Sequence, residues 1–151
     1  MKKLITFCFA FIGIVTVSLA HDHAASPLQT ALEQYVKIQT ALASDSLKGV
    51  PEAAAAIAET AKTNSGALPD AVMMQAEAVG KATDIKAARS ALKSLSATLI
   101  TVASAAKEKT GHYYEAFCPM AGAAWIQADK KVANPYYGAS MLTCGEIRRD
   151  L

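Results

Sequence analysis

The sequence lacks the short motifs that identify many enzymes. It contains no Cys-x-x-Cys-His for covalent haem attachment, no glycine-rich phosphate loop and no His-Glu-x-x-His zinc motif. It has three histidines, and two of them, His21 and His23, lie close together near the N-terminus. A catalytic nucleophile needs a base that a third group holds in place, and only His112 is left to supply one. We therefore expect a protein without enzymatic turnover.

An excess of charge is also missing. The chain carries 15 Lys and Arg against 13 Asp and Glu, a formal net charge of +2. Removal of an N-terminal segment that contains Lys2 and Lys3 would leave 15 − 2 = 13 cations against 13 anions, a net charge of zero. Binding to nucleic acid needs a concentrated cationic surface, and the sequence has no cluster of Lys or Arg. A nucleic-acid partner is therefore not expected.

Long hydrophobic runs are absent beyond the first 20 residues. Two lysines at the start, an apolar run from Leu4 to Val17 and the small residues up to Ala20 have the order of a secretory signal peptide. The run is short for a membrane span, which needs roughly 20 apolar residues. We expect cleavage after Ala20, export to the periplasm and no membrane span in the remaining 151 − 20 = 131 residues, a length typical of one domain.

The few glycines and prolines fall between stretches of helical periodicity. Ser26 with Pro27 is a plausible start for a first helix, and Asp84 a plausible N-cap for the longest one. Helices are predicted over residues 28–43, from 50 to the Asn64-Ser65-Gly66 turn, from 70 to Gly80, and from 85 to the turn at 107–111. The predicted fold class is all-α, an antiparallel bundle of about four helices over residues 28–111.

The segment 112–151 differs from the alanine-rich helices before it. It holds most of the aromatic residues and several glycine and proline turn signals. We expect an irregular cap of Cys, Met and aromatic residues that packs on the bundle as part of the same domain. Residues 21–27 are expected to be a flexible N-terminal segment.

Two cysteines, Cys118 and Cys144, remain once Cys8 leaves with the signal peptide. In an oxidising compartment an even number of cysteines favours a disulfide. A Cys118–Cys144 bridge would close a loop of about 25 residues and stabilise the fold by roughly 3 kcal/mol. The alternative is a thiolate metal site, and the two states exclude each other because a disulfide sulfur is not a thiolate.

The metal alternative depends on soft donors near the cysteines. Thiolates and thioethers together select Cu(I) over harder ions. The candidate ligands are two thiols and two thioethers, with one imidazole that a turn could bring close: Cys118, Cys144, Met120, Met141 and His112. Met73 and Met74 lie on a helical stripe and are interpreted as core residues.

The order of the C-terminal motifs resembles an exported bacterial domain of unknown function. The residues that carry the resemblance are Cys118-Pro119-Met120-Ala121, Trp125, Asn134-Pro135-Tyr136-Tyr137-Gly138, Met141-Leu142 and Cys144-Gly145. With the preceding helices, it covers roughly residues 28–145. That domain occurs alone or at the end of CusB-type periplasmic adaptors of heavy-metal efflux systems. The resemblance implies an accessory role in copper or silver handling, with Cys118, Met120, Met141 and Cys144 at the matching motif positions.

The mature N-terminus offers a second candidate metal site. Cleavage after Ala20 exposes His21-Asp22-His23. A free amine, two backbone amides and the third-position imidazole can form a square-planar nitrogen set, which Cu(II) and Ni(II) prefer. A cleavage site shifted by one residue would remove this set, and the alternative is a solvated N-terminus.

Two functions follow as hypotheses. The first is a periplasmic copper or silver binding and trafficking accessory protein, non-enzymatic, whose partners are the metal ion and a periplasmic efflux or metal-trafficking protein. The alternative is a disulfide-stapled module without a metal role that docks on an envelope protein through the aromatic cap. Its docking residues would be Tyr113, Tyr114, Trp125, Tyr136 and Tyr137.

Overall fold

The computed structural model describes residues 25–107 and 112–151, which form four α-helices followed by three short strands. The helices are α1 (Pro27–Ala43), α2 (Val50–Thr63), α3 (Asp70–Gly80) and α4 (Ile85–Ala105). The strands are β1 (Tyr114–Cys118), β2 (Ala123–Gln127) and β3 (Glu146–Asp150), with a 3-10 helix η1 (Gly138–Ser140) before β3. The expected signal peptide, His21 and His23 lie outside the described residues.

Local capping interactions define where the helices begin. The Ser26 hydroxyl accepts the amide of Gln29 at 3.1 Å, and Pro27 occupies the first turn of α1. Asp84 accepts the amide of Ala87 at 2.9 Å and starts α4. Both side chains satisfy amides that have no partner within the helix. The predicted positions of the four helices are confirmed.

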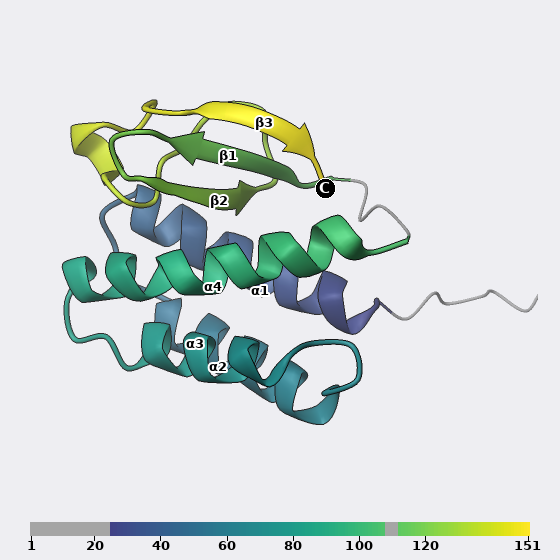
Figure 1. The fold of residues 1–151 in the computed structure, drawn as a ribbon. Helices are drawn as coiled ribbons and strands as arrows, with labels where there is room; N and C mark the ends of the chain where they lie inside the picture. The colour runs from purple at the N-terminus through teal and green to yellow at the C-terminus, as the bar shows by residue number, and fades with distance from the viewer. Residues whose placement is uncertain (1–24, 108–111) are drawn as a thin grey trace, which may run out of the picture.

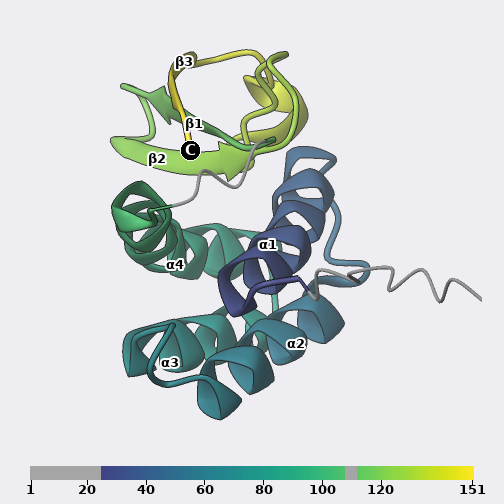
Figure 2. The ribbon, with the colours of Figure 1, turned by 90° about the vertical axis from the view of Figure 1, so that its right-hand side faces the viewer.

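The elements form three layers (Figure 1, Figure 2). Helices α1 and α4 lie in the middle, with the sheet on one side and the pair α2 and α3 on the other. Small residues allow α2 and α3 to pack closely, because a Cβ at Gly80 would lie 3.1 Å from the Cβ of Ala54. Within the described part of the chain, every helix is too short or too polar to cross a membrane.

The C-terminal segment is a three-stranded antiparallel sheet of order β2-β1-β3. Here the prediction of a purely all-α fold with an irregular cap is wrong. Strands β1 and β2 are five residues each and contain the β-favouring Tyr114, Phe117, Trp125 and Ile126. A tight turn joins them, in which the Gly122 amide bonds the Pro119 carbonyl at 3.1 Å. The sheet brings residues near both ends of the segment together.

A buried hydroxyl network joins the sheet layer to the helices. Tyr35 of α1 and Ser96 of α4, both fully buried, have their hydroxyl oxygens 2.5 Å apart. The Tyr136 hydroxyl lies 3.0 Å from Ser96 and donates to the Ala124 carbonyl at 2.6 Å. Burial raises the pKa of both Tyr35 and Tyr136, so both stay neutral donors. The network fixes the C-terminal segment on the bundle.

Candidate functional site

Cys118 and Cys144 meet at one end of the sheet. Cys118 is the last residue of β1, and Cys144 comes just before β3, which pairs with β1 so that Phe117 faces Glu146. The two sulfur atoms lie 2.7 Å apart, and both cysteines are free. This separation exceeds the 2.03–2.05 Å of a disulfide bond. Cys118 is fully buried and Cys144 is partly exposed.

The surroundings of Cys118 favour its thiolate. Burial by itself would raise the pKa of the Cys118 thiol, but hydrogen bonds from Cys144, from the amides of Ala121 and Met120 and from the Asn134 side chain outweigh it, and the pKa lies below its ordinary value. The pKa of Cys144 is raised, first by its hydrogen bond to Cys118, then by burial and by the charge of Cys118. The pair therefore loses its first proton from Cys118, while Cys144 keeps the second.

The position directly after Cys144 requires a glycine, Gly145. Its φ is +132°, and a Cβ there would lie 2.7 Å from the Phe117 carbonyl oxygen and 2.8 Å from the Trp125 ring. Any side chain would push the backbone away from β1. Glycine thus lets the Cys144 segment approach β1 closely enough for the two sulfur atoms to meet.

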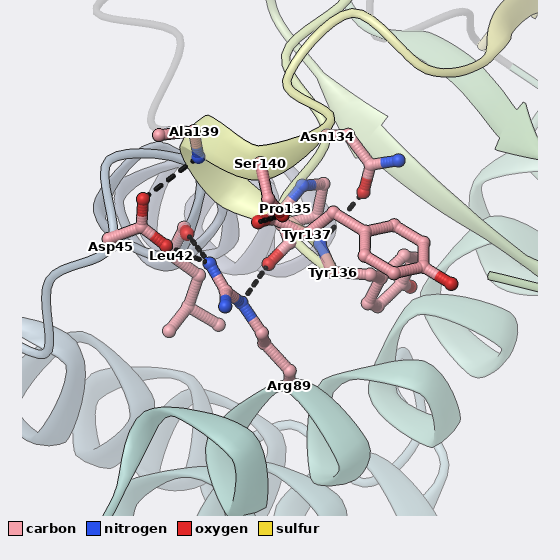
Figure 3. Close-up of polar contacts among 9 residues, drawn as sticks. All are labelled: Leu42, Asp45, Arg89, Asn134, Pro135, Tyr136, Tyr137, Ala139 and Ser140. Atoms are coloured by element: carbon pink, nitrogen blue, oxygen red, sulfur yellow. Dashed lines mark hydrogen bonds and ion pairs between the residues drawn. The ribbon is translucent and has the colours of Figure 1, made fainter. Parts of the chain in front are cut away.

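The side chain of Asn134 connects the cysteine pair to the turn that begins at Asn134 itself. This fully buried side chain donates to the Cys144 carbonyl at 2.8 Å. Its oxygen accepts the Tyr136 amide at 2.8 Å, as Figure 3 shows. The backbone amide of Asn134 also bonds the Leu142 carbonyl at 2.8 Å. Sequence reasoning placed Asn134 in a motif without a role, although an Asn that bonds the amide two residues on is a known turn former.

An ion pair between α4 and the turn after α1 holds the same C-terminal turn (Figure 3). Arg89 of α4 lies 2.6 Å from the Asp45 carboxylate and donates to the Pro135 carbonyl at 2.8 Å. Asp45 also accepts the Ala139 amide at 2.8 Å. Gly138, at φ +58°, lies so close that a Cβ would overlap Asp45 and Arg89. The sequence identifies neither charged residue, because Asp45 and Arg89 lie 44 positions apart and belong to no local motif.

The other expected metal ligands are not all close to the sulfur pair. Met120 lies in the β1–β2 turn with its side chain 68% exposed, and the Met141 carbonyl accepts the Cys144 amide at 3.0 Å. His112 is exposed and precedes β1 at the end opposite Cys118. A five-residue strand is about 13 Å from end to end at about 3.3 Å per residue. His112 therefore does not join the two cysteines.

Among the described residues, no three His, Cys, Asp or Glu side chains are grouped closely enough to hold a metal ion together. Any metal at this end of the sheet therefore depends on the two cysteine sulfurs and on donors of another kind, such as thioethers or backbone carbonyls.

The aromatic residues of this segment are mainly core residues. Trp125 is fully buried and packs edge-on against Tyr136, with ring centres 5.9 Å apart. Tyr136 and Tyr113 are also buried, whereas Tyr114 and Tyr137 are partly exposed. The expected aromatic docking surface is therefore not formed, because three of its five members pack inside the molecule.

Comparison with known proteins places the helical part of the chain in a family. The sequence model of DUF3347, described as a protein of unknown function, matches residues 31–111, more than half of the chain. The match begins within α1, covers the other three helices and ends before Cys118. No curated protein and no solved structure matches this sequence.

Proposed function

The chain belongs to the DUF3347 family of proteins of unknown function, and from that premise we propose that it is an exported, non-enzymatic protein that binds and passes on Cu(I). Cys118 and Cys144 are the proposed ligands. Silver(I), which has the same preference for soft donors, is the other metal of this class. The bundle serves as the scaffold that positions the pair.

The single observation that carries this proposal is the 2.7 Å approach of the two sulfur atoms. Soft thiolate and thioether ligands select Cu(I), and here a thiolate-favouring Cys118 lies beside a second thiol. Zinc–thiolate bonds are about 2.3 Å long with tetrahedral angles, a geometry that places two ligand sulfurs farther apart than the 2.7 Å seen here, so binding of an ion by both sulfurs requires them to move apart. The partly exposed Cys144 is the side from which a metal can arrive.

Met120 is the proposed third donor. Its backbone amide contributes to lowering the pKa of Cys118, and the residue is 68% exposed in the turn directly after Cys118. An exposed soft donor beside the buried Cys118, whose thiolate is favoured, and the partly exposed Cys144 suits the receipt and release of a metal ion. Met141 is a weaker candidate, proposed because of its backbone contact with Cys144. The Cu(II) site at His21 and His23 is a separate proposal that rests on the sequence.

A second candidate function is a disulfide-stapled module without a metal role. The same short sulfur–sulfur distance favours it, because the pair needs little movement to form a bond. With Trp125 and Tyr136 buried, such a module would contact an envelope partner through other residues than the aromatic set.

Thiol titration and copper competition on protein taken from the periplasm separate the two functions. Two titratable thiols and Cu(I) uptake against a chromogenic chelator, lost after oxidation, support the copper function. A persistent disulfide, with no copper uptake even after reduction, supports the stapled module and refutes the copper function.

A further inference from the structure

A cleft of about 300 Å³ lies between α4 and the turns of the C-terminal segment. It is separate from the cysteine pair, although the β1–β2 turn borders both. The side chains that line it on α4 and on the C-terminal segment include Lys86, Arg89, Ser90, Lys93, Tyr136 and Tyr137. Its size is at the lower end for small-molecule sites in proteins.

The charges that line this cleft have one sign. Three of its lining residues are cationic and none is a carboxylate. Arg89 is neutralised by Asp45, but Lys86 and Lys93 form no ion pair with any residue that the structure describes. A cleft lined by charges of one sign concentrates the field and attracts small ions of the opposite sign.

Hydrogen-bond donors on successive turns of α4 also face this cleft. The Lys93 ammonium donates to the Ala121 carbonyl at 2.7 Å and lies 5.6 Å from the centre of the Tyr136 ring, which holds it at the wall of the cleft. A lysine has three N–H donors, so two remain. Lys86 and Ser90 make no side-chain hydrogen bond with another described residue.

We propose that this cleft binds a small molecule that carries an oxyanion group, a phosphate or a carboxylate, through Lys86, Ser90 and Lys93. Ammonium and hydroxyl donors are suited to such oxygens. The partly exposed Tyr137 ring and the side chain of Met120 at the edge of the β1–β2 turn add an apolar wall. This wall fits a ligand with a short carbon skeleton. This proposal does not depend on copper binding.

Calorimetric titration of the full chain in a buffer free of oxyanions tests it, with inorganic phosphate and succinate as separate probes. Lys86→Gln is the informative variant because Lys86 forms no hydrogen bond or ion pair with another described residue that the substitution would remove. Lys62→Gln on α2, where Lys62 lies 4.0 Å from the exposed Glu59, is the control with the same change in charge.

We expect saturable binding of the probe. Lys86→Gln should weaken the affinity about tenfold, because it removes one charged hydrogen bond, and Lys62→Gln should leave the affinity unchanged. If only phosphate binds, the ligand carries a phosphate group, and if only succinate binds, it carries a carboxylate. If both probes bind, the cleft recognises the oxyanion group that they share. No saturable binding of either probe, or equal weakening in both variants, overturns the proposal.

Discussion

Asn134 donates a hydrogen bond from its side chain to the carbonyl oxygen of Cys144 at 2.8 Å, and the same side chain helps to lower the pKa of the Cys118 thiol. One buried side chain thus reaches both cysteines, although they are 26 positions apart. The Asn-Pro-Tyr turn and the cysteine pair are therefore one structural unit. A change in the turn is expected to alter the chemistry of the thiols as well as the stability of the fold.

Asn134→Ala tests this coupling. The substitution leaves the buried Tyr136 amide and Cys144 carbonyl without partners, which should cost about 1–3 kcal/mol of unfolding free energy. Loss of a hydrogen bond to the thiolate should also raise the pKa of Cys118. Urea unfolding measures the first effect and the pH dependence of thiol alkylation the second.

Asn64→Ala is the control, because the side chain of Asn64 bonds only Thr60 and Thr63 at the end of α2. It should leave thiol reactivity unchanged. If the pH dependence of thiol alkylation in Asn134→Ala equals that of the wild type, the turn and the cysteine pair are independent.

The contact between Gly138 and the Asp45–Arg89 ion pair predicts a difference between two glycine substitutions. Gly122 and Gly138 have nearly the same φ, +57° and +58°, but a Cβ at Gly122 would meet nothing within 4 Å. Gly122→Ala should therefore cost about 1–2 kcal/mol, the backbone term alone. Gly138→Ala should cost clearly more, because the ion pair must also move. Equal unfolding midpoints in urea for the two variants would refute this account of the turn.

The Asp45 carboxylate predicts how stability changes with pH. The Ala139 amide, then the Arg89 side chain, holds the pKa of Asp45 below its ordinary value of 3.8. A lowered folded-state pKa gives stability that is present above the ordinary pKa and is lost as the pH falls through the lowered one. Asp45→Asn should therefore be less stable than the wild type at neutral pH. In acid, where the wild-type carboxyl group is also uncharged, the difference in stability should disappear.

Urea midpoints of the wild type and Asp45→Asn over a pH series provide the measurement. The two curves should be separated at pH 7, begin to converge below the ordinary pKa of Asp45, 3.8, and meet once the pH has fallen below the lowered folded-state pKa. A separation that is the same at every pH would mean that the charge of Asp45 does not contribute to the fold.

The helices could be predicted from the sequence because their signals are local. Ser26 and Asp84 each cap an amide three residues away, and such contacts depend on neighbouring residues alone. The strands could not be predicted in the same way. Cys118 and Trp125 were identified only as motif residues, and five-residue strands leave too short a pattern to distinguish from an irregular segment.

The candidate site was predictable only in part. The sequence suggested that Cys118 and Cys144 converge, but the direction of β1, which carries His112 away from them, depends on strand pairing. The ion pair of Arg89 and Asp45 joins residues 44 positions apart. Nothing in the local sequence of either residue indicates its partner, because the pair forms only when α4 packs against the end of α1.

The proximity of the two thiols predicts the effect of oxidation. A Cys118–Cys144 disulfide closes a loop of 26 positions and should stabilise the fold by roughly 3 kcal/mol on the chain-entropy model. Oxidised protein should also take up no Cu(I), because neither sulfur is then a thiolate. Unfolding of oxidised and reduced samples in urea measures the difference. A less stable oxidised form would show that bridging strains the site.

The exposed thioether of Met120 predicts a graded effect on copper. Met120→Leu keeps the size of the side chain and removes the soft donor, so Cu(I) binding should weaken while the fold remains intact. Met74→Leu is the matched control, since Met74 is 61% exposed on α3, in the layer of helices farthest from the sheet. An equal Cu(I) affinity in the two variants would exclude Met120 as a ligand.

Cu(I) competition on reduced Cys118→Ser and Cys144→Ser tests the copper site most directly. Each substitution removes one of the two adjacent sulfurs and keeps a small side chain, so circular dichroism should show the four helices retained. The account predicts that each variant loses Cu(I) binding against the chelator. Retention of the wild-type Cu(I) affinity in both variants would contradict it.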